Sequence, residues 1–145
     1  KQKTAYEISL GLVGSEMCIR DRVKELRNRY SSLVDKVLEA IETLVFEAEK
    51  ALEKNDFVKL GNLMDINHGL LEALGVSNKK LSELVYVARS AGALGAKLTG
   101  AGGGGCIIAL APGRTKEVAA AIASAGGLVL EAKLGSRGVE VQVID

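Results

Sequence analysis

Aromatic side chains are scarce in this sequence. They make up 3% of the 145 residues, and tryptophan is absent. A hydrophobic core must therefore be filled by Leu, Val, Ile and Ala, and Ala-rich helices are expected to approach each other closely. The hydrophobic content of 48% and the length fit a single globular domain with one core.

Strong net charge and long apolar runs are also missing. The formal net charge is +1, and no basic cluster is interleaved with aromatic residues. The sequence therefore lacks the usual signatures of nucleic-acid binding and of a polybasic membrane patch. The apolar runs are far shorter than the roughly 18 residues of a transmembrane helix. We expect neither a nucleic-acid partner nor a membrane association.

Cysteine and histidine are too few to suggest a metal site or a triad. Cys18 and Cys106 lack metal-site spacing and a secretory context, which favours a reduced, cytoplasmic compartment. His68 is the only histidine, and no nucleophile or carboxylate is placed beside it by a recognisable motif. We interpret His68 as a structural cap or a surface residue, with acid–base chemistry as the minority alternative.

Glycine, by contrast, is concentrated in one place. Five of the six residues from Gly100 to Gly105 are glycines, within the run Lys97 to Cys106. Glycine loses the most backbone entropy on folding and suits positions with positive φ or close approach to the main chain. Exposed N–H groups in such a loop can form a concavity for phosphate oxygens. The alternative is a connection between two strands that binds nothing.

Known glycine motifs narrow the interpretation. The run lacks the Lys-Ser or Lys-Thr of a Walker A loop. Gly100, Gly102 and Gly105 satisfy Gly-x-Gly-x-x-Gly, but a dinucleotide fingerprint needs a helix after it. Here an apolar run over 106–111 follows and ends at Pro112-Gly113, which indicates a buried strand. The glycines are therefore expected to join two adjacent strands.

The rest of the chain predicts helices before the glycine run and a mixed segment after it. Asp56 is a predicted N-cap, Gly75 a stop signal, and Ser77 or Asn78 the cap of the next helix. The expected elements are helices over 23–55, 56–74 and 78–91, strands over 96–99 and 106–111, a helix over 114–125, and a hairpin over 128–134 and 139–144. This predicts an α+β fold, with three helices followed by a β-β-α-β-β array that forms a small, mainly antiparallel sheet.

The string Lys-Leu-Thr-Gly-Ala-Gly-Gly-Gly-Gly-Cys at 97–106, with Asn-His-Gly-Leu-Leu at 67–71 and Gly-Val-Ser at 75–77, carries a resemblance. It resembles the C-terminal half of the mevalonate kinase family, of the archaeal-like kind, in the GHMP kinase superfamily. The likeness runs from about residue 23 to the end. It implies a GHMP kinase C-terminal domain, a variant of the ferredoxin-like fold.

The resemblance also implies chemistry. A family member phosphorylates mevalonate to 5-phosphomevalonate in isoprenoid biosynthesis with ATP and Mg²⁺. The family's phosphate loop and its catalytic Asp and Lys lie in an N-terminal domain, and no such segment occurs here. We therefore expect no catalytic residue in this chain, a missing N-terminal domain as its partner, and no activity of the chain alone. Whether it forms a homodimer stays open.

Residues 1–22 do not resemble that family. The stretch from Tyr6 to Arg22 instead resembles translated sequencing-adapter read-through. We expect 1–22 to be a non-native leader and 23–145 to be the domain. Two alternative functions remain at this stage: another GHMP small-molecule kinase such as phosphomevalonate kinase, and a non-catalytic α+β ligand-binding module.

The candidate binding residues lie in the glycine-rich loop near the ATP phosphates. They are Thr99, Gly100, Ala101, Gly102, Gly103, Gly104 and Gly105. Thr99 is favoured because a hydroxyl at the edge of the loop can bond a phosphate or brace the backbone.

Weaker candidates lie outside the loop. They are Lys97, which could steer phosphate or pair with a carboxylate, Asn67 and His68. We interpret Asp65 and Glu72 as a solvated helix face rather than a Mg²⁺ pair. Cys106 is interpreted as a small buried hydrophobe.

Overall fold

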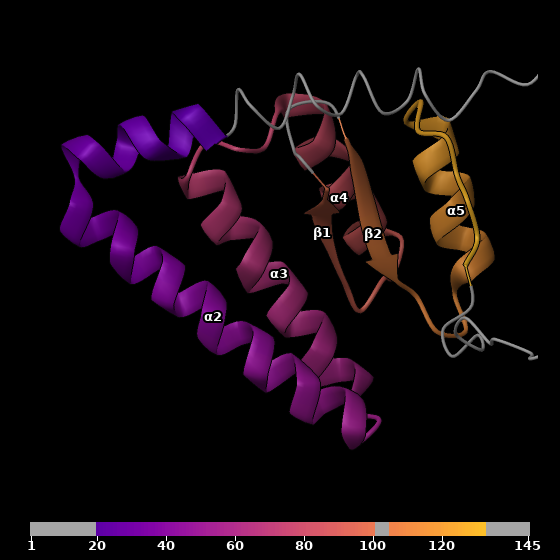
Figure 1. Ribbon diagram of the computed structural model, residues 1–145. Helices are drawn as coiled ribbons and strands as arrows, with labels where there is room; N and C mark the ends of the chain where they lie inside the picture. The colour runs from indigo at the N-terminus through magenta and orange to yellow at the C-terminus, as the bar shows by residue number, and fades with distance from the viewer. Residues whose placement is uncertain (1–19, 101–104, 133–145) are drawn as a thin grey trace, which may run out of the picture.

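The computed structural model describes residues 20–100 and 105–132, and the following statements concern these residues. Residues 20–29 are helical. They are followed by α2 (Ser31–Glu53), α3 (Phe57–Ala73), α4 (Lys79–Ser90), β1 (Gly95–Thr99), β2 (Cys106–Leu110) and α5 (Thr115–Ser124) (Figure 1). The α+β class and the order of helices, strand pair and helix are confirmed.

The first helix differs from the prediction. A single helix was expected over 23–55, but the chain bends at Tyr30, where φ is −136° and ψ is 51°. The bend brings Val23 and Leu26 against the cluster that contains Leu74 and Val76. Helical periodicity is local and does not depend on this tertiary contact. The apolar spacing therefore predicted one continuous helix across Tyr30.

Local signals placed the other helix ends correctly. The Asp56 side chain accepts a hydrogen bond from the backbone N–H of Lys59 at 2.9 Å and caps α3. Of the two candidates before α4, Asn78 is the cap, since its side chain accepts from the N–H of Leu81 at 2.9 Å. Gly75 ends the α3 turn with φ of +69°, a conformation that favours glycine.

The strands form an antiparallel pair in which Gly95 lies opposite Leu110 and Thr99 opposite Cys106. This confirms that the glycines join two adjacent strands. In Figure 1, α2 and α3 run side by side, β1 lies between α3 and β2, and α4 lies behind the strand pair. Residues 128–132, the described start of the expected hairpin, carry no strand, and 133–145 lie outside the described residues.

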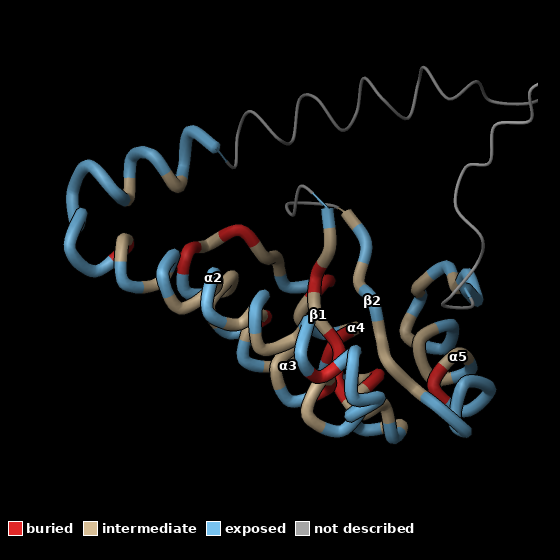
Figure 2. The backbone as a smooth tube through the Cα atoms, turned by 60° about the horizontal axis from the view of Figure 1, so that its bottom comes forward, coloured by how far each residue is buried: buried red, intermediate tan, exposed pale blue. Residues whose placement is uncertain are grey.

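Two aliphatic clusters form the core. One joins α2, α4 and β1 through Val34, Leu74, Val76, Leu81 and Leu98. The other joins α4, β1 and α5 through Val85, Ala88, Ala96 and Val118. Figure 2 shows that the buried residues gather along β1 and α4, whereas α2 is largely exposed or intermediate. The aliphatic, aromatic-poor core expected from composition is what the structure contains.

A pair of glycines sets the distance between α3 and β1. A Cβ atom on Gly95 would overlap the backbone of Gly61, and a Cβ on Gly61 would overlap the backbone of Leu94. Neither glycine has a positive φ, so the requirement is for space and not for conformation. This backbone contact fixes where β1, and the glycine-rich loop after it, lies on the helices.

Candidate functional site

The strand pair ends at the glycine-rich loop. Thr99 closes the ladder opposite Cys106, and Gly100 follows with φ of +76°. Among the described residues, no atom lies within 4 Å of a Cβ built on Gly100. The left-handed conformation therefore confirms one reason for glycine at this position. Ala101, Gly102, Gly103 and Gly104 lie outside the described residues, and Gly105 is described and half-buried.

Side chains of α3 and α4 bond the edge of β1 that faces away from β2. The Asp65 carboxylate accepts a hydrogen bond from the N–H of Ala96 at 2.8 Å. The Arg89 guanidinium donates to the carbonyl of Ala96 at 3.0 Å. Arg89 Nε also lies 2.7 Å from Asp65 Oδ1, as an ion pair without hydrogen-bond alignment. These contacts tie α3, β1 and α4 together at one residue of the strand.

The next outward-facing residue of β1 is bonded in the same way. Leu98 donates its N–H to His68 Nδ1 at 3.3 Å, and its carbonyl accepts from Lys97 Nζ at 2.9 Å. Both N–H groups and both carbonyls of Ala96 and Leu98 are thus satisfied by side chains. Buried backbone groups need such partners, so this edge is held without a further strand.

His68 is a buried structural residue. Its side chain is 1% exposed, so the surface alternative considered from sequence is wrong. Because Nδ1 accepts a hydrogen bond, the neutral imidazole carries its proton on Nε2. Nε2 lies 3.5 Å from Glu72 Oε1 and has no hydrogen-bond partner among the described residues. Burial is the main cause that lowers the pKa of His68 from its ordinary 6.5.

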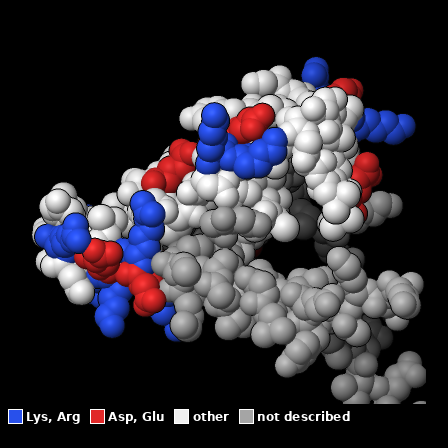
Figure 3. All heavy atoms as spheres, turned by 90° about the horizontal axis from the view of Figure 1, so that it is seen from above, with Lys and Arg blue, Asp and Glu red and all other residues white. Residues whose placement is uncertain are grey.

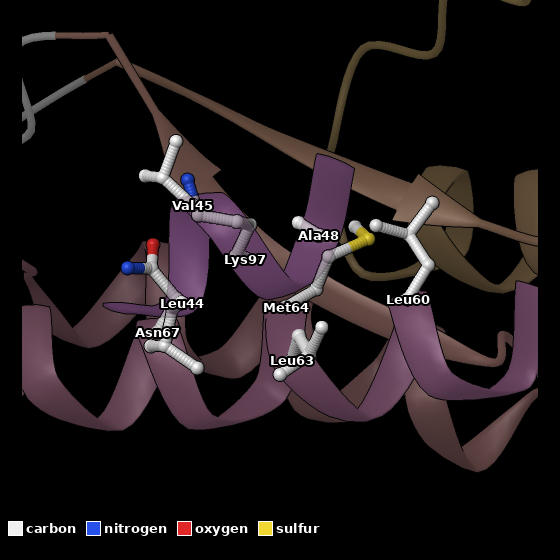
Figure 4. Close-up of a pocket in the computed structure, with 8 residues that line it drawn as sticks. All are labelled: Leu44, Val45, Ala48, Leu60, Leu63, Met64, Asn67 and Lys97. Carbon is white, nitrogen blue, oxygen red and sulfur yellow. The ribbon is translucent and has the colours of Figure 1, made fainter. Parts of the chain in front are cut away.

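Lys97 and Asn67 share a groove between α2 and α3. The groove has a volume of about 170 Å³, and its other lining residues are Leu44, Val45, Ala48, Leu60, Leu63 and Met64. Figure 4 shows the amide of Asn67 and the amine of Lys97 as the nitrogen-bearing groups along this apolar lining. Burial lowers the pKa of Lys97, and no carboxylate pairs with it within the described ranges. The structure thus brings two of the weaker candidates together.

Two interpretations from sequence are wrong in detail. Asp65 and Glu72 do not form a solvated face: Asp65 bonds Ala96, and Glu72 accepts a hydrogen bond from the Ser82 hydroxyl. Cys106 is exposed rather than buried. The first error arose because helical spacing shows which residues share a face, but not what packs on that face.

Arg89 is the residue that sequence reasoning missed. It bonds Asp65 and Ala96, and its guanidinium carbon lies 5.7 Å from the centre of the Tyr86 ring. The sequence held only a weak signal for this contact. Asp65 and His68 are three residues apart on α3, so their side chains lie on the same helix face and can contact the same neighbouring element. The sequence alone could not show that this neighbour is β1 or that Arg89 completes the contact.

The described residues offer no preassembled metal site, and the face of the molecule seen in Figure 3 mixes charges of both signs. In Figure 3, positively and negatively charged side chains lie close to each other on the face shown. Residues 20–100 and 105–132 contain no group of three His, Cys, Asp or Glu side chains arranged to hold a metal. Within the same residues, no helix is long and apolar enough to cross a membrane.

A family model described as "GHMP kinases C terminal" matches residues 48–128. This span holds the helices that bond β1, the strand pair, the glycine-rich loop and α5. The chain belongs to the GHMP kinase C-terminal family. The family resemblance seen in the sequence is thereby confirmed.

Curated relatives sharpen the assignment. The chain is 49% identical to the mevalonate kinase of Pyrococcus abyssi, with 94% of this chain and 43% of the relative covered. It is 50% identical to the mevalonate kinase of Pyrococcus horikoshii, with the same coverage. Each match extends into the first 22 residues, since residues 23–145 alone are a smaller share of the chain. The chain spans less than half the length of these relatives.

Solved structures agree with the fold. The crystal structure of L. major mevalonate kinase in complex with R-mevalonate is 32% identical, with a TM-score of 0.68 over 76% of this chain and 33% of that one. The Methanococcus jannaschii mevalonate kinase is 31% identical, with a TM-score of 0.62 over 75% of this chain and 32% of that one. The chain therefore shares its fold with about a third of each of these solved mevalonate kinase chains.

Proposed function

We propose that this chain is the C-terminal part of an ATP-dependent mevalonate kinase, which converts mevalonate to 5-phosphomevalonate in isoprenoid biosynthesis. The observation that carries the proposal is the pair of curated mevalonate kinases at 49% and 50% identity. The position of the glycine-rich loop, at the end of a strand pair held by α3 and α4, supports it. The reaction moves the γ-phosphoryl group of ATP to the primary alcohol of mevalonate.

The loop is the proposed contribution of this chain to the active site. Its residues are Thr99, Gly100, Ala101, Gly102, Gly103, Gly104 and Gly105. Backbone N–H groups in turn conformations attract anions, and Gly100 has the left-handed backbone conformation that such turns contain. We propose that these residues lie near the ATP phosphates. Lys97 and Asn67, which share the groove between α2 and α3, are secondary candidates.

The catalytic groups are proposed to lie elsewhere. Phosphoryl transfer depends mostly on positioning and on electrostatic stabilisation of the transferring group. The described residues contain no carboxylate cluster for a cation. Mg²⁺ would therefore be held by the ATP phosphates and by an N-terminal domain, and this chain would shape the phosphate side of the site.

Partners and location follow from the same proposal. The chain would require the N-terminal domain of a longer protein, and it would take mevalonate and ATP as small-molecule substrates. A homodimer is a further proposal that oligomer measurements can test. We propose a cytoplasmic location, because the cysteines Cys18 and Cys106 lack the spacing of a disulfide framework or a metal site.

The proposed kinase activity is tested by joining this chain to the N-terminal portion of a relative. The purified 145-residue chain is expected to show no mevalonate-dependent ADP release. A chimera that joins residues 23–145 to the N-terminal portion of the Pyrococcus abyssi mevalonate kinase, at the aligned position, is expected to release ADP when mevalonate is added. Activity of the chain alone, or a folded chimera that binds ATP but ignores mevalonate, would contradict the proposal.

The same chimera separates the alternatives. If it phosphorylates 5-phosphomevalonate in preference to mevalonate, the sibling kinase is the better assignment. A non-catalytic binding module predicts that the chimera folds and binds ligand without turnover of either acceptor. The N-terminal portion of the relative, expressed without residues 23–145, is the matched control for background activity.

A further inference from the structure

We propose that His68 is a positioning residue which, while its imidazole is neutral, holds β1 and the entrance of the glycine-rich loop in place, and which releases that strand when it is protonated. The effect on catalysis rests on the proposed kinase function. The hydrogen bond between the Leu98 N–H and His68 Nδ1 does not depend on that function, because it lies within the described residues.

The geometry gives His68 one defined task. It lies on α3, nearly fully buried, and its Nδ1 accepts the N–H of Leu98. Leu98 is one residue before Thr99, where β1 ends, and two before Gly100, where the loop backbone turns left-handed. The second edge contact, from Asp65 to Ala96, lies two residues earlier in the strand. His68 is therefore the helix contact closest to the loop.

Protonation would remove this contact outright. A doubly protonated imidazole has donors at both nitrogens and no acceptor. Nδ1–H would then face the N–H of Leu98, and a buried backbone donor would lose its partner. The strand end would be pushed from α3, whereas Asp65 and Arg89 would still hold Ala96. The release is thus local to the loop end of β1.

Four charged groups around His68 influence its protonation. Glu72 and Asp65 on α3 favour the charged form, while Arg89 on α4 and Lys97 on β1 oppose it. Burial opposes it most, and the pKa of His68 is lowered as a result. The unfolded chain therefore takes up a proton before the folded one. The stability from neutral His68 is complete above pH 6.5 and is lost as the pH falls from there toward the lowered pKa.

The first test needs no variant. His68 is the only histidine in the sequence, so its imidazole ¹⁵N signals in the 145-residue chain require no assignment. We expect the Nε2–H tautomer at pH 7.5 and a titration midpoint below 6.5, with the Leu98 amide signal shifting at the same midpoint. An Nδ1–H tautomer, or a Leu98 amide that ignores the titration, would overturn the proposal.

The second test isolates the acceptor. In His68→Asn the side-chain oxygen can replace Nδ1, and in His68→Gln the amide reaches toward the Nε2 position. We expect Leu98 amide protection from hydrogen exchange to survive in the Asn variant without pH dependence, and to fall about tenfold in the Gln variant, the worth of one hydrogen bond. A role in packing alone predicts the opposite order, because Gln fills more of the space. That order would contradict the proposal.

The third test links the bond to turnover in the chimera. In the unsubstituted chimera, we expect kcat to fall as the pH is lowered, with the same midpoint as the His68 titration. In the His68→Asn chimera, we expect this fall at low pH to be absent. If the chimera lacks mevalonate-dependent turnover while the two exchange and tautomer tests succeed, the kinase assignment fails and the positioning bond stands. If turnover is normal but His68→Asn retains the same acidic limb, the positioning proposal fails and the kinase assignment stands.

Discussion

The contact between α3 and β1 is tightly packed, whereas the outer face of α2 leaves apolar side chains exposed. At the first, two glycines bring backbones together, and the outward-facing polar groups of Ala96 and Leu98 are matched by side chains. At the second, large apolar residues remain exposed: Phe46 by 55% and Leu52 by 48%. The first region tolerates little change, and the second should tolerate much.

The difference shows what positions the candidate site. The inward residues of α2 pack on the core or line the groove, but α2 makes none of the hydrogen bonds that hold β1. The strand that leads into the glycine-rich loop is placed by α3 and α4. Substitutions that disturb the loop should therefore cluster on those two helices and on β1, even though α2 is the longest element among the described residues.

The largest effect is expected for Gly95→Ala. The new Cβ would overlap the Gly61 backbone, and neither backbone can move without separating α3 from β1. Overpacking of this kind costs about 1–3 kcal/mol or more. Thermal or denaturant unfolding of the 145-residue chain measures the loss.

Gly69→Ala is the matched control for this substitution. Gly69 is exposed within α3, and no atom of residues 20–100 or 105–132 lies within 4 Å of a Cβ added there. Alanine there should stabilise the helix by about 0.5–1 kcal/mol. Equal effects of the two substitutions would show that the close contact between α3 and β1 is misplaced.

Asp65→Leu should have the next largest effect. It leaves the N–H of Ala96 without its acceptor and Arg89 without its ion pair, and an unsatisfied buried group costs about 1–3 kcal/mol. Asp65→Asn keeps an oxygen for Ala96 and should lose less. Denaturant titration of both variants gives the order, and an Asn variant as unstable as the Leu variant would show that charge, not the backbone bond, dominates.

Phe46→Ser tests the tolerant region. Phe and Ser have similar helix propensities, and the ring is more than half exposed, so the substitution should change the unfolding free energy of the 145-residue chain by no more than about 0.5 kcal/mol. A loss above about 2 kcal/mol would mean that this face is packed against other residues.

The smallest effect is expected for deletion of residues 1–22, which we propose to be a non-native leader even though the matches to the two Pyrococcus relatives extend into them. The thermal midpoint should stay nearly unchanged. Deletion of residues 1–19 alone is a useful comparison, because residues 20–22 belong to the first helix and the Arg22 side chain lies beside Gly75. A midpoint several degrees lower for either deletion would contradict the leader proposal.

The sequence could predict elements whose signals are local. Asp56 and Asn78 are N-cap residues and predict the starts of α3 and α4. Gly75 predicts the end of α3, and the glycine run predicts the connection between the two strands. The bend at Tyr30 escaped prediction because its cause is a contact with Leu74 and Val76, more than forty positions away. Long-range contacts of this kind leave no mark on helical periodicity.

The candidate site divides in the same way. Glycine at position 100 could be assigned a special conformation from the sequence, and its φ bears that out. The partners of Asp65, His68 and Glu72 could not be assigned, because each depends on how α3 packs against β1 and α4. The aliphatic core followed from composition, but which residues of α2 would stay exposed did not.

We propose above all that this domain presents its glycine-rich loop to the nucleotide phosphates of a mevalonate kinase. The most direct measurement is kcat, together with the thermal midpoint, of Gly103→Val in the active chimera. The account predicts a loss of about 10²-fold or more in turnover with little change in the midpoint, because the side chain would exclude the close backbone approach. Turnover equal to that of the unsubstituted chimera, in an equally stable protein, would contradict it.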